Sequence, residues 1–131
     1  MSDMKLEEGI RDIVRRDPRF APQAYYFIFE ALEYTLHNLN IRRHVSGREL
    51  LDGTKQYALE VFGFLARTVF YEWGITSTED IGQLVFNLVS ADLLMKNEAD
   101  SMADFRDAFD FEEAFDEGFR REGLPLRIDL D

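Results

Sequence analysis

Apolar residues recur three or four positions apart along most of this chain, which is the spacing that places them on one side of an α-helix. Leu6, Ile10 and Ile13 show this spacing near the N-terminus, where residues 3–16 are predicted to be helical. Similar patterns predict further helices at about 22–37, 47–61, 64–73, 78–92 and 110–121. The sequence therefore predicts a mainly α fold, a compact orthogonal bundle of five to six helices.

Signals at the helix ends support these segments. Ser46 and Glu49 have the spacing of a capping box, in which each side chain bonds to the backbone N–H of the other. Gly63 is expected to divide the long central stretch into two helices, because glycine weakens a helix interior. Leu65, just after that break, is expected on the buried side, and Gly74 is expected to cap the second helix.

The centre of the chain has a second interpretation. Residues 64–73, a turn at 74–75 and residues 78–92 have the outline of a helix-turn-helix, and a small winged-helix-like β-hairpin would follow near 93–105. A helix that reads DNA carries basic residues, but residues 78–92 contain no Lys or Arg. An acidic winged-helix-like regulator that does not bind DNA directly is therefore one alternative function.

The length of 131 residues fits a single domain, with a helical core at 1–100 and an acidic, Phe-rich C-terminal segment at 101–131. The chain has no cysteine, which excludes thiolate metal sites and suits a reducing cytoplasm. Its N-terminal residues are polar, and no apolar run is long enough to span a membrane. It has no glycine-rich phosphate loop. We therefore expect a cytoplasmic protein without a cofactor.

Negative charge is concentrated in one part of the chain. Residues 1–75 contain 11 acidic and 10 basic side chains, whereas residues 76–131 contain 15 acidic and 5 basic ones. Nearly all of the net charge of −11 therefore belongs to the C-terminal part. Such a field repels the phosphates of nucleic acids and anionic membranes, so neither is an expected partner. A basic protein surface would be attracted.

An anion site is predicted where the most basic stretch of the chain meets the start of a helix. Arg42, Arg43 and His44 directly precede Ser46, and the N–H groups of a helix start favour a negatively charged ligand. The alternative, which we prefer, is a surface turn whose arginines pair with the acidic C-terminal segment. A small-ligand binder or an enzyme with its site near these residues is a second alternative function, for which no catalytic residue is assigned.

Three other sets of residues have both a chemical and a structural interpretation, and we prefer the structural one for each. Glu30, Glu33 and His37 share a helix face but lack the Glu-x-x-His spacing of di-iron bundles, so no metal is expected. The acidic residues between 100 and 116 lack the spacing of a calcium-binding loop and predict a solvated face. Core packing, rather than a ligand pocket, is expected for a group of central aromatic residues: Phe64, Phe70, Tyr71 and Trp73.

The C-terminal segment has phenylalanines at helical spacing. Phe111, Phe115 and Phe119 lie four residues apart with acidic residues between them, which predicts an amphipathic element. Such an element either docks on a basic groove of a partner or folds back on its own domain. We predict that the interaction residues are Phe105, Phe109, Phe111, Phe115 and Phe119. The preferred function is a non-enzymatic protein–protein interaction module, with a protein partner or a second copy in a homodimer.

Several stretches together resemble one bacterial family. They include Asp17-Pro18-Arg19-Phe20 and Trp73-Gly74-Ile75, within a set at 17–20, 24–25, 29–35, 44–51, 66–69, 73–80, 85–89, 100–101, 104–105 and 110–111. Over residues 10–116 the chain is similar to a family of conserved hypothetical proteins, without an assigned activity, from the Planctomycetes–Verrucomicrobia group. The resemblance implies a bacterial cytoplasmic protein and assigns no catalytic residues.

Overall fold

Five α-helices and three short helical turns make up the part of the chain that the computed structural model describes, residues 3–40, 45–95 and 102–117. The α-helices are α1 (Asp3–Arg16), α2 (Pro22–Leu39), α3 (Gly47–Phe62), α4 (Ala66–Glu72) and α5 (Thr78–Ser90). The turns are two 3₁₀ helices, η1 (Gly63–Leu65) and η2 (Met102–Phe105), and a π-helical turn, η3 (Glu112–Glu117). The prediction of a mainly helical fold is confirmed.

Two finer parts of that prediction are not supported. No strand occurs among the described residues, and the described portion of the expected hairpin at 93–105 is an irregular stretch followed by η2. Residues 96–101 of that hairpin lie outside the described ranges. The sixth helix, predicted at 110–121, is not an α-helix in its described part but the π-helical turn Glu112–Glu117. A π-turn and an α-turn both place residues four apart on one side, so the phenylalanine spacing did not separate them.

The predicted helix ends are confirmed where the structure describes them. Ser46 Oγ accepts a hydrogen bond from the Glu49 N–H at 3.1 Å, and Glu49 Oε1 accepts one from the Ser46 N–H at 3.0 Å. After α4, the N–H groups of Gly74 and Ile75 donate to the carbonyls of Tyr71 and Phe70. This pairing is the Schellman motif, and Gly74 permits it because its φ is +93°.

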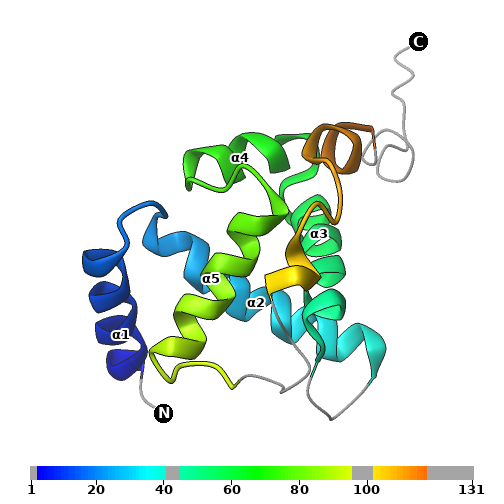
Figure 1. Cartoon of the computed structure of the whole chain (residues 1–131). Helices are drawn as coiled ribbons and strands as arrows, with labels where there is room; N and C mark the ends of the chain where they lie inside the picture. The colour runs from blue at the N-terminus through cyan, green and yellow to red at the C-terminus, as the bar shows by residue number, and fades with distance from the viewer. Residues whose placement is uncertain (1–2, 41–44, 96–101, 118–131) are drawn as a thin grey trace.

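The helices pack around two central elements. Figure 1 shows α1 and α3 on opposite sides of the molecule, with α2 and α5 between them and α4 at one end beside η3. Both central helices contact α1 and α3 as well as each other. The two helices α2 and α3 approach closely at Gly53, where an added Cβ atom would overlap Thr35 Oγ1. Glycine at this position therefore sets the distance between the two helices.

The core draws side chains from every α-helix and from the C-terminal segment. Its largest fully buried members are Ile10, Phe20, Tyr25, Ile28, Leu51, Phe70, Ile75, Ile81, Leu84, Leu88, Phe105 and Phe115. Burial of each such side chain contributes roughly 1.5–3 kcal/mol relative to exposure. The described segment 102–117 is therefore part of the core and not an appendage to it.

Candidate interaction surface

The described part of the predicted anion site is a helix cap. The hydroxyl and the N–H of Ser46 are both bonded to Glu49, so a carboxylate already lies at the positive end of α3. A pocket of about 210 Å³ beside this first turn has Glu49, Asp52 and Leu39 among its lining residues, and no Lys or Arg among those described. Arg42, Arg43 and His44 lie outside the described residues, so their share of the site stays a prediction.

The described phenylalanines of the C-terminal segment pack on the chain's own domain. Phe105, Phe111 and Phe115 are at most 4% exposed, and Phe109 packs partly buried against the same core. Phe70 on α4 contacts the rings of Phe111 and Phe115 at centroid distances of 5.9 and 5.2 Å. These described side chains therefore face inward, whereas Phe119 belongs to the part of the chain that the structure does not describe.

Two glycines make the space that Phe105 occupies. A Cβ atom on Gly82 of α5 would lie 2.7 Å from Phe105 Cγ, and one on Gly47 of α3 would lie 3.3 Å from its Cε2. Both distances are shorter than ordinary carbon–carbon contacts. Thr78 adds the polar part of this socket, since its Oγ1 donates to the Phe105 carbonyl at 2.5 Å and accepts from the Ala108 N–H at 3.1 Å.

The predicted central aromatic group separates into a core half and a surface half. Trp73 lies 5.5 Å from Phe27 and 6.2 Å from Phe70 between ring centroids, inside a packed aromatic cluster. Phe64 and Tyr71 are instead 69% and 47% exposed. Packed rings surround Trp73, which does not support a ligand pocket at that residue.

Carboxylates on α2 and α3 bond to tyrosines. Tyr57 donates to Glu30 Oε1 at 3.3 Å, and Tyr34 donates to Glu60 Oε2 at 2.8 Å. Desolvation, followed by the nearby Glu30 carboxylate, raises the pKa of Tyr57. Across the described ranges no three His, Asp or Glu side chains are grouped so as to hold a metal ion, including the glutamates near His37.

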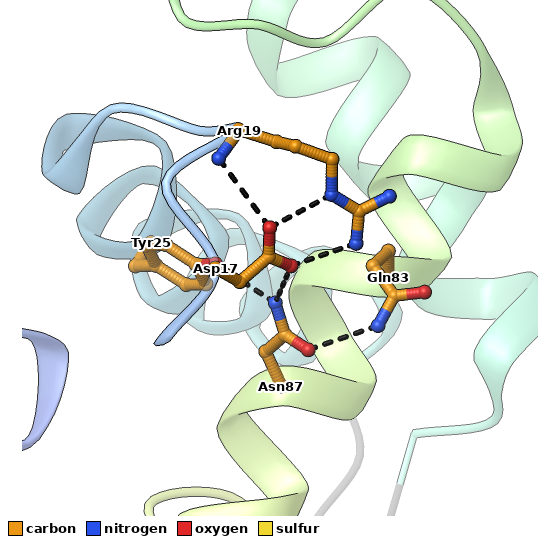
Figure 2. A network of polar contacts seen from close by, with 5 residues as sticks. All are labelled: Asp17, Arg19, Tyr25, Gln83 and Asn87. Atoms are coloured by element: carbon orange, nitrogen blue, oxygen red, sulfur yellow. Dashed lines mark hydrogen bonds and ion pairs between the residues drawn. The ribbon is translucent and has the colours of Figure 1, made fainter. Parts of the chain in front are cut away.

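A polar network joins the loop after α1 to α2 and α5, and sequence reasoning did not predict it. Figure 2 shows Asp17 at its centre. Its carboxylate accepts from Arg19 Nε and Nη2, each at 2.7 Å, from the Arg19 N–H and from Asn87 Nδ2 at 2.9 Å. Asn87 Nδ2 also donates to the Tyr25 hydroxyl, and Gln83 Nε2 donates to Asn87 Oδ1.

This network has a structural role. The hydrogen bonds from Arg19, together with the one from Asn87, hold the pKa of Asp17 well below its ordinary value and outweigh the opposing effect of burial. With four donors on one carboxylate, no position is left for a substrate or metal. The sequence contains one signal for this network, which is Asn87 in the middle of an otherwise apolar helix. An amide in such a position usually has a specific hydrogen-bond partner.

Three large apolar side chains are exposed where α3 meets η1. Val61, Phe64 and Leu65 are 50%, 69% and 48% exposed within five consecutive residues, and we call them the α3–η1 patch. Leu65 was expected on the buried side, and that expectation is wrong. Gly63 has a φ of +57°, so the chain turns between α3 and η1 and the helical spacing does not continue across the break.

Acidic side chains border the α3–η1 patch. Glu60 is an exposed neighbour on α3, and η3, which contacts both α3 and η1, has exposed Glu112 and Glu113. The nearby cation, Arg67, is paired with Asp116 at 2.6 Å. The described surroundings of the patch therefore have a net negative charge.

Comparisons with protein-family models, curated proteins and solved structures found no match to this chain. Within the described residues, none of the helices has both the length and the apolar character needed to cross a membrane.

Proposed function

We propose that this chain is a non-enzymatic protein-interaction module and that the α3–η1 patch is its binding surface. The observation that supports this most directly is the exposure of three large apolar side chains, Val61, Phe64 and Leu65, within five consecutive residues. Exposed apolar side chains gathered in one region are typical of sites that bind other proteins. Apolar and aromatic anchors also dominate the energy of such interfaces.

The charge around the patch supports one kind of partner. With Glu60, Glu112 and Glu113 at its border, a ligand that brings an apolar or aromatic side chain flanked by Lys or Arg gains both burial and electrostatic complementarity. We therefore propose a basic protein segment as the partner. A cytoplasmic location and the absence of nucleic acid and membrane partners belong to the same proposal, supported by the net charge of −11 and the lack of cysteine.

The other candidate functions have less support. A ligand site near Arg42, Arg43 and His44 has no described pocket with a basic lining. A winged-helix regulator has no strand among the described residues that would belong to its wing. Membership of the bacterial family suggested by the sequence stays a prediction.

The proposal is tested by changing the patch without changing the fold. Val61→Asp and Leu65→Asp each place a carboxylate in an exposed position that already has acidic neighbours. Met4→Asp, at an apolar residue of α1 that is 66% exposed, is the matched control. Tagged full-length proteins, checked for equal helicity, are used to capture partners from cell extract. Each captured protein is then purified and titrated by calorimetry.

We expect a partner with a basic segment whose affinity falls about tenfold or more in both patch variants, a loss of about 1.4 kcal/mol or more, and is unchanged in Met4→Asp. Light scattering identifies the case in which the partner is a second copy, because the wild type would be a dimer and the patch variants monomers. Equal binding by all four proteins would contradict the proposal.

A further inference from the structure

Helix α1 lies at one edge of the molecule and leaves one of its sides to solvent. Figure 1 shows it on the side opposite α3, and it packs on α2 and α5. The solvent side includes a large apolar side chain, because Met4 is 66% exposed. Residues 7, 8, 11 and 15 follow residue 4 at helical spacing, so they share this side of α1.

A groove runs beside this side, between α1 and the start of α2. It has a volume of about 430 Å³, and its lining includes Ile10, Val14, Pro22 and Tyr26, together with Glu7 and Arg11. The groove has an apolar base, since Ile10 is 1% exposed and both Val14 and Tyr26 pack against the core. A methionine side chain is flexible and makes favourable contacts with aromatic rings, so it suits a groove that includes Tyr26.

The charges of α1 change sign along the helix. Residues 3–9 contain three acidic and one basic side chain, whereas residues 10–16 contain three basic and one acidic. Arg15 is paired with Asp12 at 2.9 Å, but Glu7 and Arg11 are 3.9 Å apart, beyond hydrogen-bond distance. The helix dipole favours this order of charges, but it does not explain an apolar groove and an exposed methionine beside them. A second, antiparallel copy of α1 would be complementary to the first.

We propose that two copies of this chain pair through α1 in an antiparallel arrangement about a two-fold axis. With the axis level with residue 9, Glu7 of each copy lies opposite Arg11 of the other. Met4 then lies opposite Val14, at the groove of the second copy. A two-fold interface uses the same surface of both protomers, so each of these contacts occurs twice. The inference goes beyond the proposed function, because it uses α1 and not the α3–η1 patch.

The charge distribution favours α1 over the α3–η1 patch as the place for a second copy. The chain has a net charge of −11, so two copies repel each other in most orientations. Two patches facing each other would add to this repulsion, since Glu60, Glu112 and Glu113 border each of them. At α1, each acidic half meets a basic half instead. We expect a weak dimer, because one helix and the start of another give a small interface.

Exchanging the two central charges tests this arrangement. Sedimentation and light scattering of the full-length protein, from about 1 µM to 1 mM, should show a dimer for the wild type. Glu7→Arg and Arg11→Glu each create two pairs of like charges in the interface, and each should weaken the dimer about tenfold or more. An equimolar mixture of the two variants should form a heterodimer, because every changed side chain then faces an opposite charge. The double variant should dimerise as the wild type does.

The controls separate this surface from the patch. Arg48→Glu changes the net charge as Arg11→Glu does, at an exposed position of α3, and should leave the dimer unchanged. Val61→Asp should also leave it unchanged. Met4→Asp should weaken the dimer without altering the affinity for a basic partner. Circular dichroism checks that all variants have equal helicity.

Three results would overturn the proposal. The first is a wild type that stays monomeric at the highest concentration. The second is a dimer that Val61→Asp removes and the α1 variants do not, which would place the second copy on the patch. The third is a mixture of Glu7→Arg and Arg11→Glu that remains monomeric, which would exclude the antiparallel pairing. A dimer with the predicted α1 dependence, in a protein whose patch binds no partner, would leave this inference standing and contradict the proposed function.

Discussion

Asp17 joins three separate parts of the chain through one carboxylate. It is bonded to Arg19 in its own loop and to Asn87 on α5, while Asn87 also bonds to Tyr25 on α2. The Asp17 side chain is 19% exposed, so water competes little for these donors. Bonds from a charged donor and a partly buried amide are stronger than those between neutral exposed groups.

The variant Asp17→Asn should lower the free energy of unfolding at pH 7 by about 1–3 kcal/mol, because an amide cannot accept all four hydrogen bonds. The folded-state pKa lies below the ordinary 3.8. The stability that Asp17 contributes is therefore present above that pH and is lost as the pH falls below it. Urea unfolding at pH 7 and at about pH 3 should show a smaller difference between wild type and variant at the lower pH. An equal difference at both would contradict this account.

Gly53 controls the distance between α2 and α3. In Gly53→Ala the new methyl group would meet Thr35 Oγ1, a short, buried side chain that is held by the Ala31 carbonyl at 2.7 Å. We expect a net loss of about 1–3 kcal/mol, although alanine favours a helix over glycine by about 1 kcal/mol. Thermal unfolding measures the change, with Ser90→Ala at an exposed helical position as the control. A Gly53→Ala protein as stable as wild type would mean that the helices can separate at little cost.

Among the elements, those set by neighbouring residues were predictable. The capping box at Ser46 and the Schellman motif at Gly74 each form within a few positions of the chain, so residue types alone indicate them. The C-terminal segment was only half predictable. Its phenylalanine spacing showed that one side is buried, but any apolar surface would have satisfied that pattern.

The glycines in α3 and α5 were the missed signal. A glycine inside a helical pattern often marks a close approach by another group, and at Gly82 and Gly47 that group is Phe105. The sequence contains both glycines and the phenylalanine, but nothing local connects them. The hydrogen bond between Asp17 and Asn87 also has no local sequence signal, since its partners are 70 residues apart.

The docking of the C-terminal segment should depend on Gly82. In Gly82→Ala, a methyl group within 2.8 Å of Phe105 Cβ and Cγ would expel that ring. We expect a loss of about 3–5 kcal/mol, comparable to Phe105→Ala, because both leave the socket unfilled. Urea unfolding of the double variant should show far less than the sum of the two losses. Additive losses would show that Phe105 does not need the space above Gly82.

For the whole molecule, repulsion among the acidic side chains lowers the stability of the folded state. The chain has a net charge of −11, and the described C-terminal segment places Asp107, Asp110, Glu112 and Glu113 on the surface. Like charges repel more in the compact state than in the unfolded chain. The net charge and its position along the chain could be predicted from the sequence. The surface on which the acidic segment packs could be identified only from the tertiary contacts.

Salt should therefore stabilise this protein. Raising sodium chloride from about 0.02 to 0.3 M shortens the screening length, and we expect Tm to rise by about 2–5 °C. The double variant Glu112→Gln with Glu113→Gln should show a smaller rise, because it has less repulsion to screen. A Tm independent of salt in both proteins would show that ion pairs such as Arg67–Asp116 offset the repulsion.

The socket for Phe105 also has a consequence for the order of synthesis. The walls of the socket, at Gly47 and Gly82, are made long before the residue that fills them. Phe111 and Phe115 complete the same core and emerge from the ribosome later still. A nascent chain that stalls before residue 105 therefore exposes an open apolar cleft, the type of surface that chaperones and proteases recognise. The core can therefore close only after the described C-terminal segment has been synthesised.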